Sequence, residues 1–398
     1  MKSWTLKAGL ELAIFATAAA GPACAAPQSA IPLYKHVFVI VEENKGYEQI
    51  MSQPQWTPVI HRLTSEYGSA TQFYGEVHSS EGNYLAMVGG DTFGIHDDDA
   101  FYCHAGVKDR FCENSAEPGY ADHDVTARSL IDQLAEKGLT WKGYFEDIPA
   151  PGSLMPRWPV SDYPSRGVPN EMYAAKHNAF VSFRSINREP YPELAWHIVG
   201  FNQLGRDLAA DTMPNYAQII PNQCNEMHGS EGPGVPVDCR GGDSAGVIKR
   251  GDAEVGILVD KIMRSKVWTD PGNTAIVVTF DENNGGERSH GAQGCCGYEP
   301  QSKANFGGGH IVTIVITNHG PRHLQDPTPY NHYSLLRSTE AAFGIDEYLG
   351  HAADNDKGVV TMTPLFCGES LSKTRKLKEN RRVAAYPDPI DSWLSLGT

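Results

Sequence analysis

Two short polar clusters offer the oxygen ligands of a metal site. Glu43 and Asn44 closely follow one run of apolar residues, and Asp281 and Glu282 directly follow another. Carboxylate and amide oxygens are the ligands that hard cations such as Mg²⁺, Ca²⁺ and Mn²⁺ prefer. If both runs are parallel strands, their carboxyl ends meet at one edge of a sheet, where such folds bind ligands. We therefore expect the two clusters to hold one divalent cation.

A self-contained calcium loop is the alternative for the second cluster. Asp281 and Asn283 match positions 1 and 3 of an EF-hand loop, but position 12 is Ala292, where that loop needs a bidentate Glu. A strand rather than a helix is expected before it. The EF-hand interpretation is therefore poor, and we expect Asn283–Glu287 to form a glycine-rich turn that leads the backbone away from the site.

A nucleophile for such a site is available in "EVHSSEGNYLAMVGGDTFG". Ser79 or Ser80 would lie in a short turn before a helix whose amino end favours a phosphate. A serine hydroxyl is a weak nucleophile and needs a metal or a base to ionise it. By itself the segment is more typical of an ordinary Ser-rich helix cap than of a nucleophile.

Strands and helices alternate along the chain, which predicts an α/β fold with a mostly parallel sheet. Buried strands are expected at the unbroken β-branched runs HVFVIV (36–41), TAIVVTF (274–280) and IVTIVIT (311–317). Helical periodicity appears in 124–138, with Asp124 as the cap and Gly138 at the end, and in 252–268. The polar segments 97–124 and 222–246 are expected to be long capping loops.

Composition limits the class of protein. The 398 residues are 40% hydrophobic and only 20% charged, which is typical of a globular protein and allows one large domain or two smaller ones. The formal net charge of −15 disfavours binding to nucleic acid, because that affinity depends on Lys and Arg. A phosphorylated substrate would need a local cation to overcome this field.

The first 25 residues have the features of an export signal. A positive start, a short apolar run and an A-x-A site before Ala26 predict cleavage there, and no later segment is apolar enough for a stable insertion into a membrane. In an oxidising compartment, Cys103 with Cys112 and Cys224 with Cys239 are plausible disulfides. That leaves a third pairing open and one thiol over, and predicts a periplasmic or secreted protein.

Several motifs together resemble the bacterial and fungal acid phosphatase and phospholipase C family, whose fold is like that of alkaline phosphatase. The resemblance runs from about His36 to about Gly344 and rests on HVFVIVEENKGYEQIM, HSSEGNYLAMVGG, TARSLIDQLAEKGLTWKGYFEDIP, KHNAFVSF, IIPNQCNEMHG, VVTFDENNGGE and NHYSLLRSTEAAFG. It implies a three-layer sandwich with a mostly parallel central sheet and long capping loops, formed by a single phosphoesterase domain over 26–398. It is closer to the phosphatase branch than to the phospholipases.

The same resemblance implies a role for each candidate residue. The family's metal ligands correspond to Glu43, Asn44, Asp281 and Glu282, and its nucleophile, which also binds the metal, corresponds to Ser80. The remaining roles implied are catalysis by His228 and His332 and substrate binding by Asn83 and His177.

Four positions depart from the family pattern. Gly46 and Glu48 replace a Ser and an Asp, Gly82 replaces a proline, and Glu226 replaces an Asp. The ligand positions are intact, so these departures affect the expected substrate preference more than the expected activity.

The function implied is that of a secreted, metal-dependent phosphomonoesterase that hydrolyses small phosphate esters through a phosphoserine. The alternative within enzymes is a phospholipase C-like phosphodiesterase. The alternative from another class is an exported, non-enzymatic protein in which the same ligands hold a structural cation. The sequence indicates neither the metal among Mg, Ca and Mn nor the oligomeric state.

Overall fold

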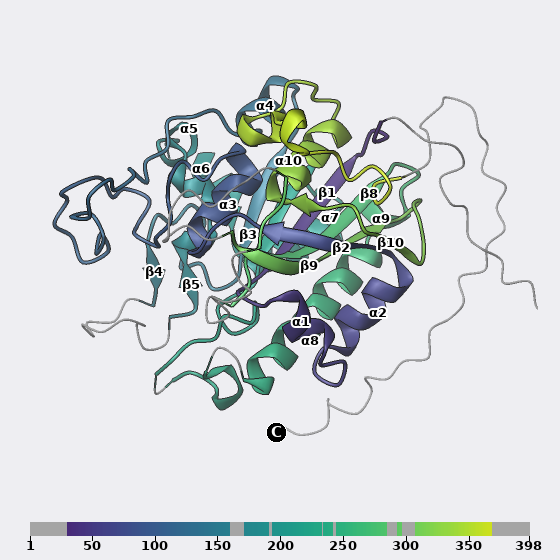
Figure 1. The fold of residues 1–398 in the computed structure, drawn as a ribbon, viewed down its shortest axis with the longest axis horizontal. Coiled ribbons are helices and arrows are strands. Elements are labelled where there is room, and N and C mark those ends of the chain that lie inside the picture. The colour runs from purple at the N-terminus through teal and green to yellow at the C-terminus, as the bar shows by residue number, and fades with distance from the viewer. Residues whose placement is uncertain are drawn as a thin grey trace, which may run out of the picture.

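The computed structural model describes residues 30–159, 171–190, 193–232, 234–241, 244–284, 293–296 and 307–367. Within these ranges a central sheet lies between two layers of helices (Figure 1). The strands are β1 (His36–Glu42), β2 (Gly68–Gly75), β3 (Trp141–Phe145), β4 (Arg157–Trp158), β5 (Tyr173–Ala174), β6 (Ile198–Val199), β7 (Tyr216–Ile220), β8 (Thr274–Phe280), β9 (Gly309–Thr317), β10 (Leu324–Asp326) and β11 (Tyr330–Asn331).

The α-helices flank this sheet or lie in its connections. They are α1 (Tyr47–Met51), α2 (Pro58–Glu66), α3 (Ser80–Gly89), α4 (Leu130–Glu136), α5 (Arg184–Asn187), α6 (Glu193–His197), α7 (Phe201–Ala210), α8 (Ala245–Met263), α9 (Lys266–Thr269) and α10 (His332–Ala342). Short 3-10 helices are η1 (Ala175–His177), η2 (Ala179–Ser182), η3 (Val237–Cys239), η4 (Gly350–Ala353) and η5 (Asn355–Lys357).

The central sheet is mostly parallel, as predicted. Its spatial order is β10-β2-β9-β8-β1-β7-β3-β6, with β11 also paired to β2. Strand β9 is antiparallel to both of its neighbours, β2 and β8, whereas the remaining described pairs of this sheet are parallel. The carboxyl ends of β1, β8 and β2 therefore lie at one edge of the sheet, and the expected α/β three-layer fold is confirmed.

Strands β1 and β8 are buried along their whole length because helices cover both faces. Successive side chains of a strand point to opposite faces. Glu42 lies against α8, where a Cβ added at Gly251 would come within 2.9 Å of its Oε2. The next residue, Glu43, contacts α3 on the other face. Glu42 therefore packs under α8, whereas its neighbour Glu43 points towards α3, the helix that begins with Ser80.

The structure corrects the predicted start of the helix in 124–138. Helix α4 begins at Leu130, and Ser129 caps it in a capping box with Asp132. Asp124, the expected cap, instead accepts hydrogen bonds from Arg184. A carboxylate that finds a long-range partner of opposite charge is not available for a local cap. Gly138 does follow the helix, with a φ of +67°.

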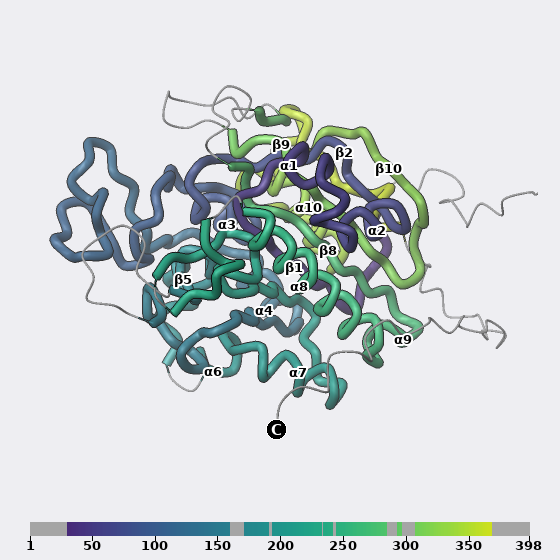
Figure 2. The backbone as a smooth tube through the Cα atoms, turned by 90° about the horizontal axis from the view of Figure 1, so that it is seen from below, coloured from purple at the N-terminus to yellow at the C-terminus, as the bar shows by residue number. Residues whose placement is uncertain are grey.

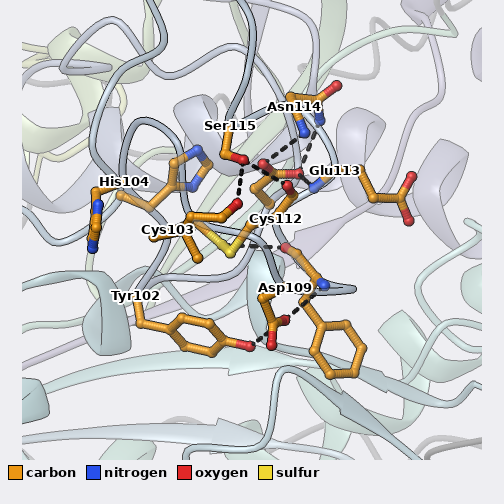
Figure 3. The surroundings of a disulfide bond; sticks show 12 residues. Tyr102, Cys103, His104, Asp109, Cys112, Glu113, Asn114 and Ser115 are labelled. Atoms are coloured by element: carbon orange, nitrogen blue, oxygen red, sulfur yellow. Dashed lines mark hydrogen bonds between the residues drawn. A yellow bond between two sulfur atoms is a disulfide. The ribbon is translucent and has the colours of Figure 1, made fainter.

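Two disulfides stabilise the capping loops as predicted. Cys103–Cys112 holds the loop that protrudes from the body in Figure 2, and Cys224–Cys239 holds the loop between β7 and α8. Figure 3 shows the first bond within a network in which Ser115 donates to backbone carbonyls and Asp109 accepts from Tyr102.

The remaining described cysteines are also bonded. Cys295 pairs with its neighbour Cys296, and Cys367 is disulfide-bonded too, so none of the described cysteines is a free thiol. The thiol expected to be left over concerns the chain without residues 1–25, which lie outside the described residues, so it stays a prediction.

Some expectations fall outside the described residues. These include the export signal 1–25 and Gly285–Glu287 of the glycine-rich turn after Asp281. Among the described residues, no helix combines the length and the apolar character needed to cross a membrane.

A buried carboxyl on α10 should make folding stability depend on pH. Burial raises the pKa of Glu340 from its ordinary value of 4.5 to about 8, although its carboxylate accepts a hydrogen bond from Leu349 N at 3.0 Å. The folded state therefore binds more protons than the unfolded state between these values, so the stabilising contribution is full below pH 4.5 and is lost as the pH rises towards 8.

Glu340→Gln should remove this dependence, because the amide cannot ionise and still accepts from Leu349. Denaturant unfolding at a series of pH values should show wild type losing about 3 kcal/mol relative to the variant across this window. Glu347→Gln, at an exposed position, is the matched control and should follow wild type. Parallel curves for wild type and Glu340→Gln would contradict the prediction.

Candidate active site

The two acidic clusters predicted from the sequence meet at the carboxyl edge of the sheet. Strands β1 and β8 are neighbours in parallel register, with Glu42 opposite Phe280. The residues that follow are therefore level with one another. The backbone N–H of Asn44 donates to Asp281 Oδ1 at 3.1 Å, and that of Asp281 donates to the Glu42 carbonyl at 3.0 Å. These bonds cross-link the two strand ends.

Ser80 reaches the same point from the third strand of that edge. It follows β2 through a short turn and is the first residue of α3, with only 1% of its surface exposed. Its Oγ lies 3.1 Å from Glu43 Oε2, 3.4 Å from Asn44 Oδ1 and 3.5 Å from Glu282 Oε1. A neutral hydroxyl has one proton, so it can donate to only one of these three acceptors at a time.

The carboxylates around Ser80 are buried almost completely. Glu43 and Asp281 have no exposed surface and Glu282 has 3%. Burial, followed by repulsion from neighbouring carboxylates, raises the pKa of Glu43 and Glu282 well above the ordinary range, and burial raises that of Asp281 to about 6. The site stores unfavourable electrostatic energy that a bound positive charge would relieve.

The donor set fits a hard cation. The Asn44 Oδ1 faces the acceptors Asp281 Oδ1 and Glu43 Oε2, an arrangement satisfied either by turning the amide so that its nitrogen donates or by a cation shared between the oxygens. Carboxylate, amide and hydroxyl oxygens are ligands of hard divalent ions. Within the described ranges, no three His, Cys, Asp or Glu side chains alone form a ready metal cluster, so Asn44 and Ser80 would have to complete the set.

Tyr84 was not predicted as a site residue and holds Glu43 in place. Its hydroxyl donates to Glu43 Oε1 at 2.7 Å, and it lies four residues after Ser80, on the same face of α3. His177 stacks on its ring and places Nε2 3.2 Å from the same oxygen. Glu226 in turn lies 3.0 Å from His177 Nδ1. This chain orients Glu43, so His177 contacts a predicted ligand directly.

Two further histidines lie near the ligands in different settings. His78, which was not predicted as a site residue, contacts Glu282 through Nδ1 and keeps 19% of its side chain exposed. His228 is partly exposed, its ring is 5.8 Å from that of His177, and its Nδ1 lies 2.9 Å from the Gly229 carbonyl. That contact requires the proton on Nδ1, which leaves Nε2 of the neutral ring as an acceptor.

His332 occupies a position that does not suit the predicted catalytic role. It is fully buried at the start of α10, and its Nε2 donates to the Asp281 carbonyl at 2.6 Å. Its backbone N–H donates to buried Glu76 at 3.0 Å. The ring therefore supports the backbone of a candidate ligand, and its position in the motif could not distinguish this from contact with substrate.

Asn83 makes its hydrogen bonds to the backbone of the turn before Ser80. Its Oδ1 accepts from the backbone of Glu76 and Val77 at 2.8 and 3.2 Å, and its Nδ2 donates to the carbonyls of Val77 and Ser79 at 2.9 and 3.4 Å. All of its polar atoms are used within the turn before Ser80, which indicates a role in shaping that turn, and its predicted contact with substrate stays a prediction.

Sequence comparisons place this chain among phosphoesterases. The Phosphoesterase family matches residues 52–346. The phosphatidylinositol-3-phosphatase of Mycobacterium tuberculosis is 26% identical over 80% of this chain and 79% of its own length. An acid phosphatase of Aspergillus fumigatus is 25% identical over 78% of this chain, which spans only 55% of that protein. A phosphate-repressible acid phosphatase of Penicillium chrysogenum is 24% identical over 72% of this chain and 54% of its own length.

Solved structures with a similar chain trace are more distant. A protein in the alkaline phosphatase superfamily from Vibrio parahaemolyticus aligns with 87% of this chain and 72% of its own, at 14% identity and a TM-score of 0.47.

The repulsion among the buried carboxylates predicts that Asp281→Asn has opposite effects on stability with and without a bound cation. Without divalent cation, Asp281→Asn removes a buried negative charge and should raise the free energy of unfolding by about 1 to 2 kcal/mol. With Mg²⁺, Ca²⁺ or Mn²⁺ in excess, wild type should gain about 3 kcal/mol at a concentration near 100 times Kd, whereas the variant should gain little.

Thermal unfolding with and without chelator measures both effects. The exposed Asp260→Asn is the matched control and should respond to cation as wild type does. An equal response of wild type and Asp281→Asn would contradict the assignment of Asp281 as a ligand.

Proposed function

Because the chain belongs to the Phosphoesterase family, we propose that it is an exported, metal-dependent phosphomonoesterase that works through a phosphoserine at Ser80. The observation that carries this proposal is the position of the Ser80 hydroxyl, buried at the amino end of α3 and within 3.5 Å of three acceptor oxygens. A structural cation site would not need a serine at its centre. The names of the relatives, phosphatases of three organisms, favour a monoester over the phosphodiester alternative.

Glu43, Asn44, Asp281, Glu282 and Ser80 would hold the cation. A divalent ion there would lower the pKa of the serine hydroxyl and offset negative charge on the phosphoryl group. The chain itself positions the nucleophile, because the turn held by Asn83 fixes the approach to α3 and Ser80 is buried there.

Ser80 Oγ attacks phosphorus in the first step, the bond from phosphorus to the leaving oxygen breaks, and the released alkoxide takes a proton from solvent water, which leaves a phosphoserine. The proton of Ser80 has an acceptor at 3.1 Å in Glu43 Oε2. The orientation of Glu43 depends on Tyr84 and His177, so these two residues position the base rather than contact the substrate.

His228 is the better placed of the two predicted catalytic histidines. Burial and the charge of Lys176 lower its pKa to about 3 in the free protein, and a phosphate dianion would act in the opposite direction. With its proton on Nδ1, Nε2 can accept a proton from the water that attacks the phosphoserine. His332 is assigned to the support of Asp281 instead.

Export is part of the proposal and is supported by the disulfides. Three described bonds, Cys103–Cys112, Cys224–Cys239 and Cys295–Cys296, are most stable in an oxidising compartment such as the periplasm or the extracellular space.

Ser80→Ala should abolish turnover while the fold persists. Loss of the nucleophile should lower kcat for an aryl phosphate monoester by roughly 10⁴-fold or more. Ser79→Ala is the matched control, because its side chain makes no cap hydrogen bond to α3, and it should retain activity within a few fold. Circular dichroism of each variant checks the fold.

The same assay separates the alternatives. Preferred hydrolysis of a matched diester would favour the phospholipase C-like alternative. Absence of turnover in wild type, with stabilisation by cation retained, would favour a non-enzymatic metal-binding protein. Retained turnover in Ser80→Ala would contradict the serine mechanism.

A further inference from the structure

Lys176 is a buried cation beside the site that the family motif does not assign. It lies in η1, directly before His177, and only 14% of its side chain is exposed. Its Nζ is 3.1 Å from Asp98 Oδ2. Burial alone would lower the pKa of this amine, but the carboxylates of Asp98 and, next in strength, Glu43 raise it above its ordinary value. The ammonium therefore stays charged next to its partner Asp98.

The ion pair adjoins the site, because Lys176 directly precedes His177, whose Nε2 lies 3.2 Å from Glu43 Oε1. Lys176 is among the leading charges that favour the ionised form of four buried carboxyls, those of Glu43, Glu226, Asp281 and Glu282. It also disfavours protonation of His228.

Asp98 influences fewer of these carboxyls than Lys176 does. Among those four carboxyls, it is a leading charge only on Glu282.

Three consecutive aspartates fix the geometry of the pair. Asp97 contacts His123 at 3.1 Å, and Asp99 accepts from the backbone of Glu113 and Asn114, at the base of the disulfide loop. Asp98, between them, accepts from the N–H of Glu81 at 3.4 Å with Oδ1 while Oδ2 holds Lys176. The ammonium is thus tied through one carboxylate to the residue that follows Ser80.

The charge balance explains why such a cation is needed. Glu43, Asp281 and Glu282 carry up to three negative charges, which a single divalent ion does not neutralise. A phosphate monoester dianion brings two more negative charges, whereas a diester brings one. A fixed positive charge that adjoins these ligands therefore benefits the monoester more, since Coulomb energy scales with the charge of the ligand.

We propose that Lys176, held by Asp98, is the specificity-determining residue that makes the site favour dianionic monoesters over monoanionic diesters. This inference rests on the proposed function of the site around Ser80. The ammonium attracts the non-bridging oxygens of the phosphoryl group and takes no part in proton transfer.

The test compares Lys176→Gln with Lys176→Arg. For an aryl phosphate monoester and a methyl aryl diester with the same leaving group, the ratio of kcat/KM values should fall by about 10- to 100-fold in Lys176→Gln and stay close to wild type in Lys176→Arg. The inhibition constant of inorganic phosphate should rise by a similar factor in Lys176→Gln.

Lys142→Met is the matched control. Lys142 forms a 2.6 Å ion pair with Asp207 between β3 and α7 and is buried to a similar degree, with 18% of its side chain exposed. Removing it should leave the ratio and the phosphate inhibition within twofold of wild type. The proposal is overturned if Lys176→Gln also keeps both the ratio of kcat/KM values and the inhibition constant of phosphate within twofold of wild type.

Two further measurements test the proposal if Lys176→Gln does not fold or if wild type shows no turnover. If Lys176→Gln fails to fold because Asp98 is left partly buried without its partner, the double variant Asp98→Asn, Lys176→Gln removes both charges and should show the same loss. If wild type hydrolyses neither ester, the proposed function fails, and calorimetric titration of the cation-loaded protein with inorganic phosphate still tests Lys176. Equal phosphate affinity in wild type and variant would then reject its role.

Discussion

The interaction on which the site depends is the repulsion among buried carboxylates gathered around one hydroxyl. Glu43, Asp281 and Glu282 are almost fully buried, and only one proton of Ser80 is available to the nearest acceptor oxygens. Such an arrangement costs free energy in the isolated chain, because desolvated like charges raise each other's pKa. The fold can retain this cluster of carboxylates if a bound cation, which relieves the repulsion among them, is part of the active protein.

The fold imposes this arrangement through the sheet. The parallel register of β1 and β8 places their last residues side by side, and β2 delivers Ser80 to the same edge from across β9. Because side chains alternate along β1, Glu42 packs under α8 while Glu43 is directed at α3. The surrounding groups then define the orientation of each ligand, with Tyr84 and His177 on Glu43 and His332 on the backbone of Asp281.

Local pattern and motif order were sufficient to predict the elements that carry the site. The β-branched runs correspond to β1 and β8, since an unbroken series of apolar residues is typical of a strand buried on both faces. The acidic residues that follow these two strands converge, as predicted. Pairing direction is a long-range property, so the run 311–317 gave no sign that β9 is antiparallel. The same limit explains why the predicted cap of α4 was wrong. Asp124 pairs with Arg184, 60 residues away, and Ser129 caps the helix instead.

Roles within the site were harder to predict than positions. Asn83 and His332 belong to the motif, yet their hydrogen bonds go to the backbone of the site, which only the coordinates reveal. Lys176 directly precedes a predicted histidine, and its sequence context gives no indication that it forms an ion pair with Asp98.

The central claim is that the oxygen at the focus of these carboxylates is the one that attacks phosphorus. Acid quenching of the cation-loaded protein during turnover of a phosphate monoester, followed by mass spectrometry of its peptides, tests this most directly. We predict a single phosphoryl group on the peptide that contains Ser80, absent from Ser80→Ala. A phosphoryl group on another residue, or turnover with no phosphorylated peptide in either protein, would contradict the account.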